Sequence, residues 1–362
     1  MTFVFSPDDP ALDELCERLA ALAPGLEAAD AWPGQQLDLC AHAGVFQWFL
    51  SAEWGGQQWS EPDLLRGYVK LAAACLTTTF VITQRMGAVG RIAASGNEWV
   101  QQALLPGLVG GSSFATVGIS HLTTSRQHLS RPVLRAEETA AGFVLDGYSP
   151  WVTGAEFAQH IVLGATLADR RQILLALPTD LPGVRIECAP QLVGLSASRT
   201  GPVHLGRVVA EHRWLLAGPV AEVMKQGTGA RTGGLQTSAL AIGLAKAATG
   251  YLQSQSRDRG ELADPADSLE AERAELENSM LALASGIAVC TSDDLRRRLN
   301  SLALRASQAA LAAAKGAGYV AGHPAGRWCK EALFFLVWSC PQPVVAANLC
   351  ELAGLAADSD DK

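Results

Sequence analysis

The spacing of the apolar residues changes twice along the chain, and this change most limits the folds that it can adopt. From Pro10 to Leu108 they recur mostly every three or four positions, as on one face of a helix. From about Ser112 to Val220 they form short β-type runs parted by Gly, Pro and polar turns, and from about Glu222 the helical spacing returns. Strands with no helix between them predict an antiparallel sheet or barrel between two helical regions.

The predicted organisation is therefore α+β, with three domains and a short tail. An N-terminal helical domain is expected over residues 1–111 and a β-barrel or sandwich domain over 112–220. A C-terminal helical bundle is expected over 221–357, followed by a disordered tail at 358–362.

Local signals give more detailed predictions within the helical regions. The helix that contains Trp99 is expected to end at Pro106, because proline and glycine stop helices. A later helix is expected over residues 327–338. Arg296, Arg297 and Arg298 are expected to lie on a solvated helix face or in ion pairs between subunits.

Charge and cysteine content exclude several classes of protein. The chain carries 28 Lys and Arg against 36 Asp and Glu, a net charge of −8, which argues against binding nucleic acid or anionic membranes. The start of the chain does not read as a secretory signal, and the apolar run Ala332–Trp338 is too short to span a bilayer. The eight cysteines form no CxxC pair and have no histidine at zinc spacing, which predicts reduced, mostly buried thiols, no metal site and a cytoplasmic protein.

Four segments carry a resemblance to a known family. In chain order they are Ser51–Gln57, Gly96–Leu108, Gly142–Ala155 and Ser198–Leu205. In the same order, they resemble four features of the acyl-CoA dehydrogenase family: the Pro-Glu-aromatic-Gly-Gly loop, the Leu-Pro corner, the flavin-contacting segment and the strand that closes the β domain. The resemblance to this family extends over nearly the whole chain. The resemblance implies this family's fold and FAD as cofactor.

The resemblance also implies a set of flavin-contacting residues. Trp151, Val152 and Thr153 resemble the family's Trp-Ile-Thr core, and in a strand Trp151 and Thr153 present a wall and a hydroxyl to the same side. Ser120 stands near the position of a further flavin-contacting Thr. His121 is either a donor to a flavin carbonyl, a base or a peroxyflavin partner, or else a polar residue at a strand end.

The catalytic glutamate of the family has no counterpart here. The family abstracts the α-proton of an acyl thioester with a Glu, whose position corresponds to Ser339. Some relatives carry the Glu on an earlier helix, at the position of Gly233. Glu331 is a poor substitute for the missing base, because it is about two helical turns from Ser339. The Arg that meets the cofactor's pyrophosphate is replaced by Gln255, with Arg257 and Arg259 nearby.

Three functions remain open on these residues. The first is a divergent FAD-dependent oxidoreductase acting on an acyl thioester, such as acyl-CoA, or a related substrate. The second is a flavin-dependent monooxygenase that uses reduced flavin and O2 and needs no α-proton base. The third is a non-catalytic subunit of a partner enzyme. By resemblance, a homodimer or homotetramer is expected, with an electron-transfer protein or reductase as partner.

Overall fold

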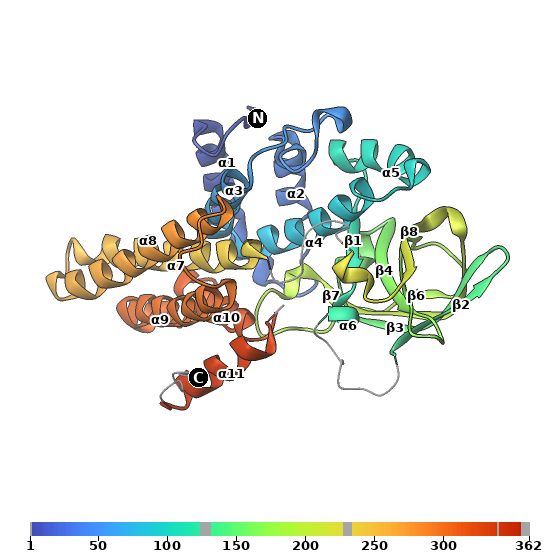
Figure 1. The fold of residues 1–362 in the computed structure, drawn as a ribbon. Coiled ribbons are helices and arrows are strands. Elements are labelled where there is room, and N and C mark those ends of the chain that lie inside the picture. Colours follow the sequence, from blue (N-terminus) through green and yellow to red (C-terminus); the bar gives the residue numbers. More distant parts are fainter. Residues whose placement is uncertain (1, 124–131, 227–233, 339, 356–362) are drawn as a thin grey trace.

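Helices form the first and last parts of the chain and strands form its middle (Figure 1). The computed structural model describes residues 2–123, 132–226, 234–338 and 340–355. The N-terminal helices are α1 (Pro10–Leu22), α2 (Gly34–His42), α3 (Glu61–Ala74), α4 (Leu76–Ala93) and α5 (Glu98–Gly110). The C-terminal helices are α7 (Leu235–Ser256), α8 (Ala263–Ala284), α9 (Ser292–Gly318), α10 (Pro324–Ala332) and α11 (Gln342–Leu352). This order confirms the predicted fold class.

The middle part is a single mixed sheet. Its elements are β1 (Ala115–Gly118), the short helix α6 (Ser120–Thr123), β2 (Leu134–Thr139), β3 (Gly142–Thr153), β4 (His160–Thr166), β5 (Gln172–Pro178), β6 (Val184–Ile186), β7 (Thr200–Glu211) and β8 (Leu215–Val220). The strand order is β6-β7-β3-β2-β4-β5-β8, and β1 pairs with β4. Most pairs are antiparallel, but β1–β4 and β2–β4 are parallel, so the sheet is not antiparallel throughout as predicted. The chain between β1 and β4 is long enough for the crossover that parallel pairing requires.

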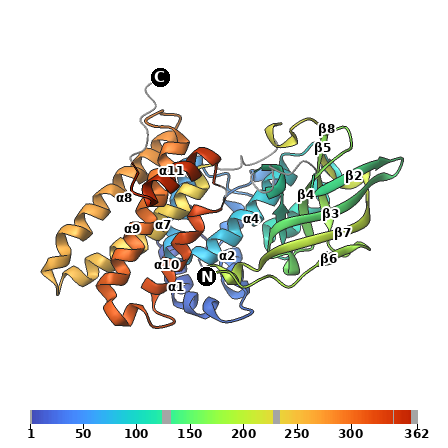
Figure 2. The ribbon, with the colours of Figure 1, turned by 90° about the horizontal axis from the view of Figure 1, so that it is seen from below.

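The molecule has two hydrophobic cores. The larger core joins the N-terminal and C-terminal helices and includes residues of β1, β4, β5 and β8, and the smaller one lies within the β domain. On α7, a Cβ at Gly243 would lie 2.6 Å from the Ala72 Cβ and 2.7 Å from the Val69 carbonyl oxygen, so glycine allows α7 to approach α3 closely. Figures 1 and 2 both show the helices gathered at one end and the β domain at the other, with α4 reaching from one to the other.

Helix α5 continues past the proline at which the sequence predicted its end. The Asn97 side chain accepts a hydrogen bond from the Val100 N–H at 3.1 Å and caps its start. Pro106 lies inside the helix, which ends at Gly110. Proline removes one backbone donor, whereas Gly111, with φ of 79°, adopts the left-handed cap that ends the helix.

Arg296 is buried, contrary to the prediction of a solvated face. Its side chain donates to the Trp338 carbonyl at 3.0 Å, and burial lowers its pKa to about 10. Arg297 and Arg298 pair with carboxylates of the same chain. Successive residues of a helix lie about 100° apart, so three in a row cannot share one face.

The helix predicted over 327–338 is shorter than expected. Helix α10 ends at Ala332, and Leu333–Leu336 form a 3-10 turn, η9. This turn brings Phe334 against Trp338, with ring centres 4.9 Å apart, and against Phe80 of α4. Within the described residues, no helix is both long and apolar enough to cross a bilayer.

Candidate active site

Trp151 and Thr153 lie at the end of β3, directly after an irregularity in its pairing. The register with β7 shifts between Ser149 and Val152. Beyond that shift Val152 is fully buried in the β-domain core, whereas Trp151 is 46% exposed. Thr153, at 2% exposure, is nearly as buried as Val152, and the alternation of side chains along a strand keeps the prediction that Thr153 shares a side with Trp151.

Thr153 belongs to a short chain of hydroxyl groups. Its Oγ1 lies 2.8 Å from the Oγ1 of Thr200, which lies 2.8 Å from the Oγ of Ser198. Each hydroxyl can both donate and accept, so the chain leaves Thr153 capable of one more hydrogen bond. The sequence placed Ser198 and Thr200 in a resembling segment but did not predict their contact with Thr153.

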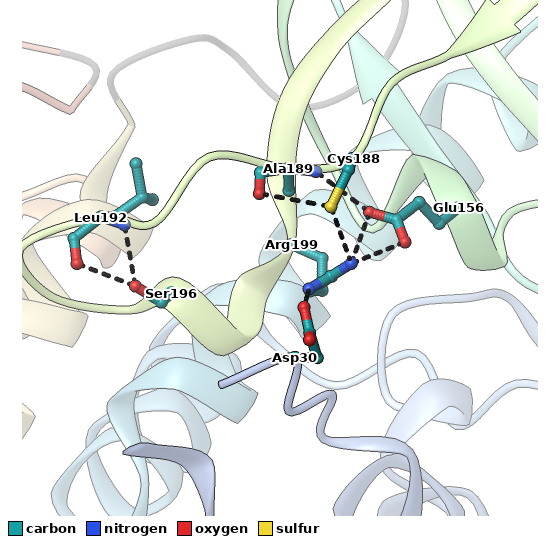
Figure 3. Close-up of polar contacts among 7 residues, drawn as sticks. All are labelled: Asp30, Glu156, Cys188, Ala189, Leu192, Ser196 and Arg199. Carbon is teal, nitrogen blue, oxygen red and sulfur yellow. Dashed lines mark hydrogen bonds and ion pairs between the residues drawn. The ribbon is translucent and has the colours of Figure 1, made fainter. Parts of the chain in front are cut away.

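A buried arginine holds the ends of β3 and β7 together (Figure 3). Arg199 donates from Nη1 to Asp30 at 2.8 Å and from Nη2 to Glu156 at 2.8 Å, and Nη2 also lies 3.7 Å from the Cys188 Sγ. Its carbonyl accepts from the Gly154 N–H at 3.0 Å. The two carboxylates raise the pKa of Arg199, so the guanidinium stays charged. This cluster, here called the Arg199 clamp, fixes the backbone beside Thr153.

The residues Ser120 and His121 form a single helical turn and not a strand end. This turn, α6, begins directly after β1 and lies against β3. His121 Nε2 lies 2.8 Å from the Gly164 carbonyl oxygen of β4. A carbonyl oxygen only accepts, so Nε2 carries the proton and Nδ1 of the neutral ring is an acceptor. Burial lowers the pKa of His121, which keeps the ring neutral.

Two buried polar atoms of α6 have no hydrogen-bond partner among the described residues. They are the Nδ1 of His121 and the Oγ of Ser120. Other buried side chains of the described residues also have unpaired atoms, but here the two atoms lie on adjacent residues of one turn, where a single ligand could meet both. The tautomer removes one predicted role of His121, because a neutral Nδ1 cannot donate to a flavin carbonyl.

The two predicted base positions, Ser339 and Gly233, lie outside the described residues, as does the predicted tail 358–362. Glu331 lies elsewhere, in a cavity lined by residues of η1 (Ala23–Glu27), α4, α10 and the segment 191–196. None of the residues lining that cavity belongs to α6 or β3. Glu331 therefore does not replace the missing base.

The arginines considered for the pyrophosphate end have different environments. Arg259 donates to the Gln255 side chain at 3.2 Å and to the Ala313 carbonyl at 2.8 Å. Arg257 is exposed. The structure thus ties Arg259 to α9.

Comparison with known proteins points to one family. No family model matches the sequence. The chain is 24% identical over 284 residues to a probable acyl-CoA dehydrogenase of Bacillus subtilis (strain 168), covering 75% of this chain and 74% of that protein. It superimposes on a glutaryl-CoA dehydrogenase from Mycobacterium smegmatis in complex with FADH2, with a TM-score of 0.77, 15% identity and 97% of each chain covered. A dibenzothiophene monooxygenase from Paenibacillus sp. A11-2 matches with a TM-score of 0.69 and 17% identity, covering 96% of each chain.

The unsatisfied atoms of α6, the exposed Trp151 and the hydroxyl chain supply an apolar wall, an acceptor and hydroxyl groups, which fit a flat ring with a polar edge such as a flavin. The similarities confirm the predicted resemblance to the acyl-CoA dehydrogenase family, and the chain shares the fold of the glutaryl-CoA dehydrogenase that it matches.

Proposed function

We propose that the chain is an FAD-dependent oxidoreductase whose flavin ring lies between the end of β3 and α6. The observation that carries this proposal is the pair of buried, unsatisfied atoms on α6, Ser120 Oγ and His121 Nδ1. A ligand that meets both atoms would remove the cost of burying them, which is about 1–3 kcal/mol for each group.

Different residues of the site would contact different parts of the flavin ring. Bound FAD supplies a two-electron acceptor that the side chains of this protein lack. Trp151 would provide an apolar wall and Thr153 a hydroxyl at the ring's edge. His121 would accept a hydrogen bond from a ring N–H through Nδ1, while its Nε2 proton stays on the Gly164 carbonyl.

The proposed substrate is an acyl thioester or a related compound. Oxidation of such a substrate requires a base for the α-proton, and neither Ser339 nor Gly233 has a carboxylate. The described residues of α6 and the end of β3 supply no carboxylate in their place, and the Nδ1 lone pair of His121 is already assigned to the flavin ring.

A flavin-dependent monooxygenase is the second candidate. The loss of a carboxylate at both base positions favours it, because that chemistry needs no α-proton base. The similarity to the dibenzothiophene monooxygenase supports the same fold for such a reaction. An acceptor at Nδ1 also suits reduced flavin, whose ring has more N–H groups than oxidised flavin.

A homodimer or homotetramer is the proposed assembly. Helix α11 and the residues after it expose Leu349, Leu352 and Leu355, each at 61–62%. Leu349 and Leu352, three positions apart, share an exposed apolar face of α11, which a second copy of the chain would cover. An electron-transfer protein or a reductase is the proposed redox partner, and the cytoplasm the proposed location.

Visible spectroscopy of the purified protein tests these proposals. FAD should bind and give the spectrum of a protein-bound flavin. Bleaching of that spectrum by an acyl-CoA under argon would support the dehydrogenase. Binding of reduced FAD with oxygen consumption, and no bleaching by acyl-CoA, would support the monooxygenase. If neither form of FAD binds, both proposals fail and the third alternative, a non-catalytic subunit, is left.

A further inference from the structure

The polar cavity that contains Glu331 lies where all three parts of the chain meet. It has a volume of about 140 Å³ and is formed by η1, by Thr77 of α4, by the segment 191–196 and by Arg327, Lys330 and Glu331 of α10. Gly194 allows that segment to approach α10 closely, because a Cβ at this position would lie 2.6 Å from the Lys330 carbonyl oxygen. The cavity shares no lining residue with α6 or β3.

Arg327 is an incompletely paired cation in this cavity. Its side chain is 12% exposed, and its Nη1 is buried with no hydrogen-bond partner in the described part of the chain. Its carboxylate neighbour is Glu331, whose Oε1 lies 3.9 Å from the Arg327 Nε, beyond hydrogen-bond distance. A guanidinium has five donors and readily binds an oxyanion with two of them, so Nη1 has capacity for a ligand.

The other charged groups of the cavity do not pair with the Arg327 Nη1. Lys330 pairs with Glu27 of η1 at 2.6 Å. The segment 191–196 carries no charge, and burial raises the pKa of the neighbouring Cys75 thiol, which stays neutral. Glu331 is 4% exposed and accepts from the Thr77 hydroxyl at 3.5 Å, and burial raises its pKa to about 7. With Glu331 protonated, the charges of Arg327, Lys330 and Glu27 sum to +1.

We propose that this cavity binds a small oxyanion, a carboxylate or phosphate group, through the guanidinium of Arg327 with Glu331 and Thr77 beside it. The volume suits such a ligand, since it corresponds to about four or five waters at roughly 30 Å³ each. Because the lining comes from all three parts of the chain, the bound anion would tie α10 to the segment 191–196 and to α4.

Titration of the full-length protein with sodium phosphate and, separately, with sodium acetate tests the proposal. Isothermal titration calorimetry at constant ionic strength, balanced with chloride, should show saturable 1:1 binding of at least one anion with a Kd on the order of 1 mM. Arg327→Gln should weaken this binding at least about tenfold. Arg135→Gln, which removes a surface arginine of β2 paired with Asp146, should leave it unchanged. No saturable binding by either anion, or equal binding by Arg327→Gln and wild type, would overturn the proposal.

The pH dependence supplies a test that does not depend on the folding of Arg327→Gln. An anion held beside protonated Glu331 should bind about tenfold more weakly for each pH unit above the pKa of that carboxyl. Acetate is the probe for this test because it stays ionised throughout the range, and Glu331→Gln, which keeps the shape and a donor but cannot ionise, should bind it with little change between pH 6 and 8.5. Affinity that is independent of pH in the wild type would contradict the assigned site.

Discussion

The Arg199 clamp and the α6 turn both border the proposed flavin site, yet their buried polar atoms are hydrogen-bonded to different extents. The Arg199 guanidinium meets two carboxylates and a thiol, and the hydroxyls of Thr153, Thr200 and Ser198 bond to one another. In α6, Ser120 Oγ and His121 Nδ1 have no partner among the described residues. In the clamp, the Arg199 Nε is also buried without a partner, but both Nη atoms are paired, so the clamp is more fully paired than α6.

This difference separates groups that stabilise the fold from groups that await a ligand. A satisfied buried network stabilises and orients the chain, whereas an unsatisfied buried group costs free energy until something pairs with it. Removing a side chain from the clamp should therefore lower stability, and removing one from α6 should lower ligand affinity instead.

Arg199→Met should produce the largest effect. The substitution leaves Glu156 and Asp30 without their cation. Because both carboxylates are partly exposed, we expect the free energy of unfolding to fall by about 2–3 kcal/mol, less than the roughly 3–5 kcal/mol lost when a fully buried ion pair is broken. Urea unfolding followed by circular dichroism measures it. The matched control is Arg135→Met on the exposed Arg135–Asp146 pair, which should cost under about 0.5 kcal/mol. Equal losses in the two variants would show that the clamp is not a structural unit.

His121→Leu should weaken FAD binding more than it weakens the fold. Loss of the Nδ1 acceptor should raise the Kd for FAD about tenfold, or 1.4 kcal/mol. Loss of the Nε2–Gly164 hydrogen bond should lower the free energy of unfolding of the flavin-free protein by about 1 kcal/mol. Fluorescence titration and urea unfolding measure the two quantities, and an unchanged Kd would remove His121 from the flavin site.

Ser120→Ala should separate affinity from stability still more clearly. Because the hydroxyl is buried and unpaired, its removal should leave the flavin-free protein as stable or up to about 1 kcal/mol more stable, while FAD binds several-fold more weakly. The control is Asn348→Ala on α11, whose side-chain Nδ2 is also buried and unpaired among the described residues. That variant should bind FAD normally. A similar loss of affinity in both would mean that the effect is not specific to α6.

The smallest effect should be that of pH on FAD affinity above neutrality. Burial lowers the pKa of His121 below its ordinary value of 6.5, so Nδ1 stays an acceptor from pH 7 to 9 and the Kd should be constant. The folded protein resists protonation of this ring more than the unfolded chain does. Stability should therefore fall as the pH drops from the ordinary value of 6.5 to that lowered pKa, and affinity should fall as the pH drops below the lowered pKa. Affinity that rises on acidification would mean that Nδ1 donates to the ligand.

The sequence predicted the features that arise from local patterns. The two changes in apolar spacing predicted helices, strands and helices in that order, and the spacing of Trp151 and Thr153 predicted that they share a side of β3. Two-residue and 3.6-residue periods are properties of short segments, so they can be seen without knowing what the segment packs against.

Features that depend on distant contacts were missed or predicted wrongly. Arg199 and Asp30 are 169 positions apart, and no local signal pairs them. The parallel pairing of β1 with β4 depends on how the intervening strands return. The break of α10 after Ala332 depends on Phe334 packing against Phe80 of α4. The single helical turn at Ser120 and His121 is too short for a periodic signal.

The central claim is that α6 and the end of β3 hold a flavin, and FAD binding by wild type, Ser120→Ala and Asn348→Ala tests it most directly. The account predicts a bound-flavin spectrum for the wild type, several-fold weaker binding for Ser120→Ala and unchanged binding for Asn348→Ala. Absence of a bound-flavin spectrum with both oxidised and reduced FAD would contradict the flavoprotein. Equal affinity of all three proteins would contradict the role of α6.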